Sequence, residues 1–330
     1  MEPIRYSVVI RTTGHAGEKY RRLLEAIAGL RPSPEEVIIV LPEGSNEPEE
    51  RLGWERFCYC QKGMVRQRLY GLEQCRTPYA LFCDDDVRFP PDFVQKLHQP
   101  IAEGIADLSA GPLLNFFPQK GVRTLASALT GGAIPMLPWR KMYVRVLRSS
   151  GYSYNRHIDT TQHLYYSTQS LPWTCFYASV QAMKDIHLED ETWLDAHGYA
   201  AMDDQTMFYK GYLRGIPAVV VSDALYEHMD AKTSTKVSSD RRTVSYSTGF
   251  NRVVFWHRFI WSVEDGVGRK AFDRIYFAYY MAAGKLYSKL NILRKKKLPE
   301  EDVAYWCGLS DGWSFVKSKE YQQLPNVVER

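Results

Sequence analysis

The stretch from Tyr79 to Asp86 reads Tyr-Ala-Leu-Phe-Cys-Asp-Asp-Asp, an apolar run that ends in three consecutive aspartates. An apolar run of this length is typical of a buried β-strand. Similar runs precede it in the chain, at residues 7–11, 37–41 and 57–60. Helical periodicity fills the intervals, over residues 17–30 and 64–75. Strands that alternate with helices predict βαβ units and a mostly parallel sheet.

The same alternation continues after the aspartates, although less evenly. We expect helices at residues 93–103 and 204–213, and strands at residues 106–110, 173–178 and 218–222. The segment 111–172 reads as irregular, because it is rich in Gly, Pro, Ser, Thr and Tyr. After residue 234 we expect a polar loop, then a helical region over 250–293 and a tail. The prediction is an α/β domain over residues 1–240 and a helical, basic extension over residues 241–330.

Composition narrows the class of protein. The chain has 330 residues, of which 45% are apolar and 24% charged, as in soluble globular proteins with a sizeable core. This balance excludes a disordered chain, a collagen-like chain and a polytopic membrane protein. The six cysteines lack paired zinc-ligand spacing and are too sparse for a disulfide scaffold. We therefore expect a reduced, cytoplasmic protein.

The net charge of +4 conceals two regions of opposite sign. Between Arg269 and Lys297 there are nine Lys and Arg against the single acid Asp273, so this window carries +8. The rest of the chain then carries −4, because 4 − 8 = −4. The positive charge of the window and the negative charge of the remainder therefore need separate explanations.

The three aspartates need a physical reason, because adjacent like charges repel each other. In an open α/β sheet, ligands bind outside the carboxyl ends of the strands, where Asp84, Asp85 and Asp86 would lie. Carboxylate oxygens are ligands that suit Mg²⁺ or Mn²⁺. Asp84 and Asp86, two apart in an extended segment, would point to the same side. The alternative is a solvated acidic turn without a cation.

A second acidic pair, Asp203 and Asp204, stands at the start of the predicted helix 204–213. One carboxylate there caps free backbone N–H groups and complements the helix dipole. Capping does not explain the second carboxylate. If it points into the cleft beside the first acidic cluster, it could act as a general base for an acceptor hydroxyl.

Together these features resemble a family 2 glycosyltransferase of the GT-A fold, an inverting enzyme that uses nucleotide-sugar donors. The Asp-x-Asp motif of that family falls on residues 84–86. Its downstream acidic pair falls on Asp203-Asp204, followed by Lys210 six positions on and Gly215 five beyond that. Residues 188–193 resemble the segment before that pair, and the Gly-rich helix 63–71 carries Arg68 at the arginine of the family. The resemblance extends over about residues 5–230.

The resemblance implies a role for each matching residue. Asp84 and Asp86, with His228 after a later strand, would be ligands of Mn²⁺ or Mg²⁺, and Asp204 would be the catalytic base. The acceptor side would include Asp203 and Trp173. The donor would be bound by Thr12, Thr13, Glu43, Arg66, Arg68, Asp84 and Asp85.

The departures from the family pattern fall in the loops that read the nucleotide base and the sugar. The first strand ends without the common proline, Glu43 stands where the family usually has an aspartate, and Leu69 replaces an asparagine. The resemblance thus implies transfer to a glycan or lipid-linked acceptor in cell-surface polysaccharide biosynthesis, but leaves the donor open. A metal-dependent nucleotidylyltransferase and a non-catalytic, membrane-associated cation-binding module remain as alternatives.

The basic C-terminal window also contains an apolar stripe at helical spacing, from Ile275 to Leu293. Such a helix either packs on the catalytic domain or lies on an anionic membrane surface. The second interpretation predicts peripheral binding at the inner face of the cytoplasmic membrane. We expect no nucleic-acid partner, because no known binding motif accompanies the charge.

Overall fold

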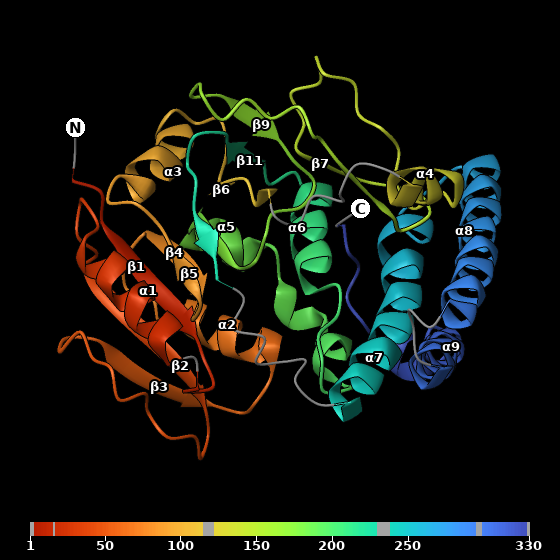
Figure 1. The fold of residues 1–330 in the computed structure, drawn as a ribbon, viewed down its shortest axis with the longest axis horizontal. Coiled ribbons are helices and arrows are strands. Elements are labelled where there is room, and N and C mark those ends of the chain that lie inside the picture. The colour runs from red at the N-terminus through yellow and green to blue at the C-terminus, as the bar shows by residue number, and fades with distance from the viewer. Residues whose placement is uncertain (1–2, 16, 115–121, 230–237, 295–298, 329–330) are drawn as a thin grey trace.

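The computed structural model of the protein describes residues 3–15, 17–114, 122–229, 238–294 and 299–328. Across these residues, eight strands form one central sheet (Figure 1). From edge to edge they are β3 (Arg56–Cys60), β2 (Glu36–Pro42), β1 (Tyr6–Arg11), β4 (Tyr79–Asp84), β10 (Cys175–Ser179), β6 (Leu108–Ala110), β11 (Ala218–Val221) and β9 (Tyr165–Ser167). The first four are parallel, as is the pair β6–β11, whereas β10 and β9 run antiparallel to their neighbours. The predicted mostly parallel α/β sheet is confirmed.

Helices cover both faces of this sheet because its strands bury side chains on both sides. In β1, Val8 and Ile10 pack in one hydrophobic cluster, and Val9 packs in another. The first cluster includes residues of α1 (Glu18–Ala28) and α3 (Phe93–Ala102). The second includes residues of α2 (Met64–Glu73), α5 (Val180–Asp185) and α6 (Asp203–Leu213). Successive side chains of a strand point to opposite faces of the sheet, so each face has its own hydrophobic cluster and its own layer of helices.

The segment between β6 and β10 is built of short elements, as predicted. Besides β9, it contains α4 (Val122–Leu129) and the antiparallel pair β7 (Val144–Val146) and β8 (Tyr152–Tyr154). A second small ladder joins β5 (Val87–Arg88) to β12 (Glu227–His228). This ladder brings two chain segments far apart in sequence to the carboxyl end of β4.

The C-terminal region contains more helix than the sequence predicted. It comprises α7 (Ser238–Trp256), the π-helical turn η4 (His257–Trp261), α8 (Val267–Leu293), α9 (Pro299–Phe315) and α10 (Lys319–Gln322). The expectation of a polar loop as far as residue 249 is wrong, because α7 begins at Ser238. The expectation of a tail after residue 293 is also wrong. Among the described residues, α9 and α10 occupy most of it.

Two glycines in this region are contact points between two helices. A Cβ atom on Gly249 of α7 would lie 2.1 Å from the Tyr305 carbonyl oxygen of α9. A Cβ on Gly308 would lie 2.0 Å from the Tyr246 carbonyl oxygen of α7. Only glycine permits the two backbones to approach this closely, so residues that weaken an isolated helix instead allow α7 and α9 to pack.

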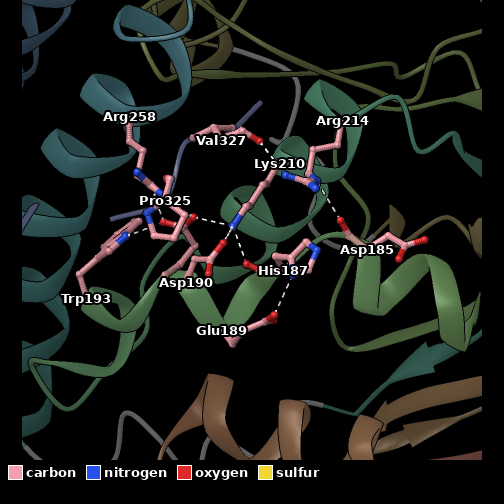
Figure 2. Close-up of polar contacts among 11 residues, drawn as sticks. Asp185, His187, Glu189, Asp190, Trp193, Lys210, Arg214, Arg258, Pro325 and Val327 are labelled. Carbon is pink, nitrogen blue, oxygen red and sulfur yellow. Dashed lines mark hydrogen bonds and ion pairs between the residues drawn. The ribbon is translucent and has the colours of Figure 1, made fainter. Parts of the chain in front are cut away.

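Buried charges join the C-terminal segment to α6 (Figure 2). Lys210 of α6 is fully buried, and its ammonium lies 2.8 Å from Glu191. The same carboxylate accepts from Arg258 at 2.6 Å, and Arg258 also donates to the Pro325 carbonyl at 2.7 Å. Arg214 donates to the Val327 carbonyl at 3.2 Å. The C-terminal residues are therefore tied to the helix that begins with the acidic pair.

The C-terminal helices share a hydrophobic core with the sheet. Phe255, Phe277 and Val316 belong to the same buried cluster as Val9 and Phe82 of the central strands. The division of the chain at residue 240 stays a prediction. Within the described ranges, we find no helix long and apolar enough to span a membrane.

Candidate active site

The carboxyl ends of β1 and β4 bring the first acidic cluster against a basic residue. Arg11 and Asp84 are register partners in the two strands, and Arg11 Nη2 lies 3.0 Å from Asp84 Oδ1. Just beyond β1, the Thr12 hydroxyl donates to Asp85 Oδ2 at 2.5 Å. Burial raises the pKa of Asp85 to about 6, although the Thr12 hydrogen bond opposes this shift. The strand ends thus hold Asp84 and Asp85 in separate polar contacts.

Asp84 and Asp86 do not share one side of an extended segment. The strand β4 ends at Asp84, and residues 85 and 86 form a turn. Asp86 is consequently directed to His228 of β12, whose Nε2 atom lies 3.1 Å from Asp86 Oδ1. The ladder between β5 and β12 sets this contact, because the Met229 N–H donates to the Asp86 carbonyl at 2.8 Å. The extended backbone expected from Asp84 to Asp86 is wrong, since a turn replaces it after Asp84.

Arg68 connects the two acidic clusters. It lies on α2, is buried, and donates to Asp84 Oδ1 at 3.0 Å and to Asp203 Oδ2 at 2.7 Å. Its guanidinium also lies over the Trp173 ring, 4.3 Å from the ring centroid. The contact combines two ion pairs with a cation–π interaction. The structure therefore brings Asp84, Arg68, Asp203 and Trp173 together.

The acidic pair at the start of α6 divides into two different environments. Asp203 is held by Arg68, and its Oδ1 atom also accepts from the Asp204 backbone N–H at 3.0 Å. Asp204 is only partly buried, and its carboxyl group lines a cavity of about 90 Å³. Burial, followed by the charge of Asp203, raises the pKa of Asp204 well above that of an ordinary aspartate. The residue with the raised pKa is thus the one that lines the cavity.

Two tyrosines line this cavity together with Asp204. Tyr143, Tyr154 and Pro172 share its wall with Asp204. The Nε1 atom of nearby Trp173 is buried without a hydrogen-bond partner among the described residues. The wall of the cavity thus combines tyrosine rings with the acidic residue Asp204.

The donor set at Asp86 and His228 fits a divalent cation that is shared with a ligand. Both side chains are mostly buried and converge on one point. Within the described ranges, no cluster of three or more His, Cys, Asp or Glu residues forms a candidate metal site. The carboxylate and the imidazole would therefore be only part of a coordination sphere. Cations such as Mg²⁺ commonly complete theirs with substrate phosphates and water.

Three of the predicted donor-binding residues lie apart from these contacts. Thr13 is half-buried beside Thr12, and Glu43 is exposed just after β2. Arg66 is exposed on α2, where its guanidinium contacts the Gln61 side chain. Among the described residues, no hydrogen bond or ion pair joins these three side chains to the aspartates.

Sequence reasoning missed two residues at the site. Arg11 pairs with Asp84, and adjacent parallel strands with polar residues at their carboxyl ends were the signal for it. Asp195 accepts from the backbone N–H groups of Met64, Val65 and Arg66, at 2.9 to 3.1 Å, and so caps α2. No sequence pattern predicts this cap, because Asp195 lies far along the chain from α2.

Solved structures with the same fold are GT-A glycosyltransferases. The S. aureus TarS 1–349 structure in complex with UDP-GlcNAc has a TM-score of 0.50 at 17% identity, over 94% of this chain and 80% of that one. The structure of GalNAc-T7 with UDP, GalNAc and Mn²⁺ also has a TM-score of 0.50, at 12% identity, over 85% of this chain and 56% of that one. These likenesses establish the GT-A fold.

Part of the sequence also matches a family model. Residues 18–171 match the model of the family described as Glycosyl transferase family 2. The match includes the aspartates at the end of β4 and Arg68 of α2. No curated protein matches the chain. The resemblance predicted from the motifs is confirmed over this range, where residues 18–171 match the family model.

Proposed function

We propose that the protein transfers a sugar, with inversion, from a nucleotide-diphosphate donor to a hydroxyl group of a glycan or lipid-linked acceptor. The observation that carries this proposal is the pair of environments at the start of α6. Arg68 neutralises the charge of Asp203. Asp204 lines a cavity, and its pKa is raised. The family 2 match and the GT-A fold support glycosyl transfer as the class of reaction.

Asp204 is the group that we assign as general base. A carboxylate with a raised pKa accepts a proton more readily than an ordinary aspartate, which suits removal of a proton from a hydroxyl as that hydroxyl attacks. Inversion follows if the acceptor oxygen attacks the anomeric carbon from the face opposite the leaving diphosphate. Trp173 and Asp203 would lie on the acceptor side.

Asp86 and His228 are the residues that would hold Mn²⁺ or Mg²⁺ on the donor diphosphate, with Asp84 behind them. Such a cation supplies charge stabilisation for the departing nucleoside diphosphate. Thr12, Thr13 and Asp85, at the ends of β1 and β4, would contact the nucleoside. The exposed Glu43 and Arg66 would reach the donor only from the rim of the site.

The biological setting that we propose is cell-surface polysaccharide assembly on the cytoplasmic side of the membrane. A lipid-linked acceptor would require the enzyme to work close to a lipid surface. The face of the molecule that would allow this is described in the next subsection, and the catalytic proposal does not depend on it.

Nucleotide binding with and without metal tests the proposal. We expect Mn²⁺ together with one of UDP, GDP or dTDP to raise the melting temperature of the full chain, and the nucleotide alone to have little effect. Asp86→Ala should abolish the metal-dependent shift, whereas Asp185→Asn, on the exposed side of α5, should retain it. Failure of every nucleotide to stabilise the protein in the presence of Mn²⁺ would contradict the proposed donor class.

A further inference from the structure

The buried residues of the long helix α8 lie along one side of the helix. Its buried residues are Asp273, Phe277 and Ser288, and Phe277 stacks on Trp256 of α7 with ring centroids 4.3 Å apart. Figure 1 shows α8 along the edge of the molecule opposite β3. The apolar stripe expected from the sequence is therefore not the packing face, because its members lie elsewhere on the helix.

The outward side of α8 is apolar. Ile275 is 70% exposed, Leu286 is 62% exposed and Leu293 is 79% exposed. With 3.6 residues per turn, six of the eight large exposed apolar residues of the helix fall in one stripe opposite the buried side. They are Phe272, Ile275, Tyr279, Leu286, Leu290 and Leu293. The stripe is about 30 Å long, since it extends over 21 residues at 1.5 Å each.

The helix α4 extends this apolar surface. The Tyr279 hydroxyl donates to the Leu129 carbonyl at the end of α4, and the Tyr276 hydroxyl donates to the Gly131 carbonyl at 3.3 Å. Leu125 and Leu129 are themselves about as exposed as Leu286. We call the exposed side chains of Leu125, Leu129 and the six α8 residues the outer apolar face. Contiguous exposed apolar surface of this kind marks an interaction site.

The charges around the outer apolar face are positive. Arg269, Arg274, Lys285, Lys289 and Arg294 of α8 are all exposed. The only acid on the helix, Asp273, is buried and paired with Arg148 at 2.6 Å, so it contributes no negative charge to this surface. An apolar stripe bordered by cations matches a layer of anionic headgroups above acyl chains.

We infer that the outer apolar face lies on an anionic lipid surface, with α8 parallel to the membrane plane. Charge decides between this partner and a second copy of the chain. Two copies joined through this face would bring the cations of one against those of the other, whereas anionic headgroups neutralise them. The leucines and Phe272 would enter the interface, and the arginines and lysines would contact lipid phosphates.

Co-sedimentation with vesicles tests this inference independently of catalysis. We expect the full chain to pellet with vesicles of phosphatidylcholine and phosphatidylglycerol at 50 mM NaCl. It should stay in the supernatant with phosphatidylcholine alone or at 500 mM NaCl. Lack of pelleting with the anionic vesicles at low salt would overturn the inference.

Two variants of the face sharpen the experiment. The triple variant Ile275→Ser, Leu286→Ser, Leu290→Ser should bind anionic vesicles at least tenfold more weakly. The double variant Arg274→Gln, Lys289→Gln should lose about fivefold for each cation removed. All five positions are exposed, so both variants should keep the circular dichroism spectrum of the parent chain.

A matched control lies elsewhere on the surface. Ile105→Ser removes an apolar side chain that is also exposed but outside the outer apolar face, and it should bind vesicles as the parent chain does. If the triple variant binds vesicles normally, the inference fails. It fails equally if light scattering shows that the parent chain is a dimer, the triple variant is a monomer and neither pellets with lipid. That result would make the face an interface between copies.

Discussion

Arg68 Nη1 lies 2.7 Å from Asp203 Oδ2, and both side chains are buried between α2 and α6. This ion pair explains how two adjacent aspartates differ in chemistry. The guanidinium neutralises Asp203, and Asp204 beside it keeps a raised pKa. Because Arg68 also reaches Asp84, one side chain fixes the distance between the proposed base and the end of β4.

Replacement of Arg68 should destabilise the fold strongly. Arg68→Met leaves Asp84 and Asp203 without their shared partner, and removal of one member of a buried ion pair typically lowers the free energy of unfolding by about 3–5 kcal/mol. Urea denaturation at pH 7 measures this loss. Arg66→Met, two positions away on the exposed side of the same helix, should change stability by less than about 0.5 kcal/mol. Equal effects of the two substitutions would show that the Arg68 network contributes little.

The raised pKa of Asp204 predicts a pH-dependent effect of Asp204→Asn on stability. A carboxyl group whose folded-state pKa exceeds its unfolded value contributes stability below the unfolded pKa, and this contribution is lost as the pH rises through the folded pKa. The asparagine variant does not titrate, so it should gain stability relative to the parent chain between pH 5 and 8. Urea midpoints at several pH values measure the difference. A gap that is constant with pH would contradict the raised pKa.

The contact between His228 and Asp86 predicts a role for the imidazole in metal-dependent nucleotide binding. His228→Ala should weaken Mn²⁺-dependent binding of the preferred nucleoside diphosphate about 10–100-fold, because one protein ligand is lost. Isothermal titration calorimetry with and without Mn²⁺ provides the measurement. His163→Ala, which removes a partly exposed histidine paired with Asp223, should bind as the parent chain does. Unchanged affinity of the His228 variant would remove this residue from the proposed ligands.

The buried charges that join α6 to the C-terminal segment predict a second large effect on stability. Glu191→Gln leaves the ammonium of Lys210 and the guanidinium of Arg258 without their shared carboxylate (Figure 2). We expect a loss of about 3–5 kcal/mol in the free energy of unfolding. Glu189→Gln, in the same turn but exposed, should be nearly neutral. A small effect of Glu191→Gln would show that the hydrogen bonds to the carbonyls of Pro325 and Val327 suffice.

Much of the fold could be predicted from local patterns. The strands β1, β2 and β4 are buried on both faces, so each appears as a continuous apolar run, and the helices between the first strands show clear periodicity. The helix α9 was missed because Gly308 and Gly312 suggest a loop in isolation. The structural role of these glycines is visible only in the folded chain, where α7 packs against them. Tertiary contact here overrides local propensity.

The site was predictable in its residue types and less so in its contacts. The aspartates at the end of β4 and at the start of α6 were found from their position after a strand and at a helix terminus. That Arg68 contacts both clusters could not be read from the sequence, because the contact depends on how α2 and α6 pack on the sheet. The turn at residues 85 and 86 also depends on β12, which lies far along the chain.

The turnover of Asp204→Asn tests the central claim most directly. With the nucleotide-sugar whose nucleotide stabilises the protein, release of the nucleoside diphosphate should fall by about 10²–10⁴-fold, since a positioned general base contributes that much. Binding of the nucleoside diphosphate with Mn²⁺ should stay within about twofold, and Asp185→Asn should be fully active. Turnover by Asp204→Asn within tenfold of the parent chain would contradict the assignment of Asp204 as the base.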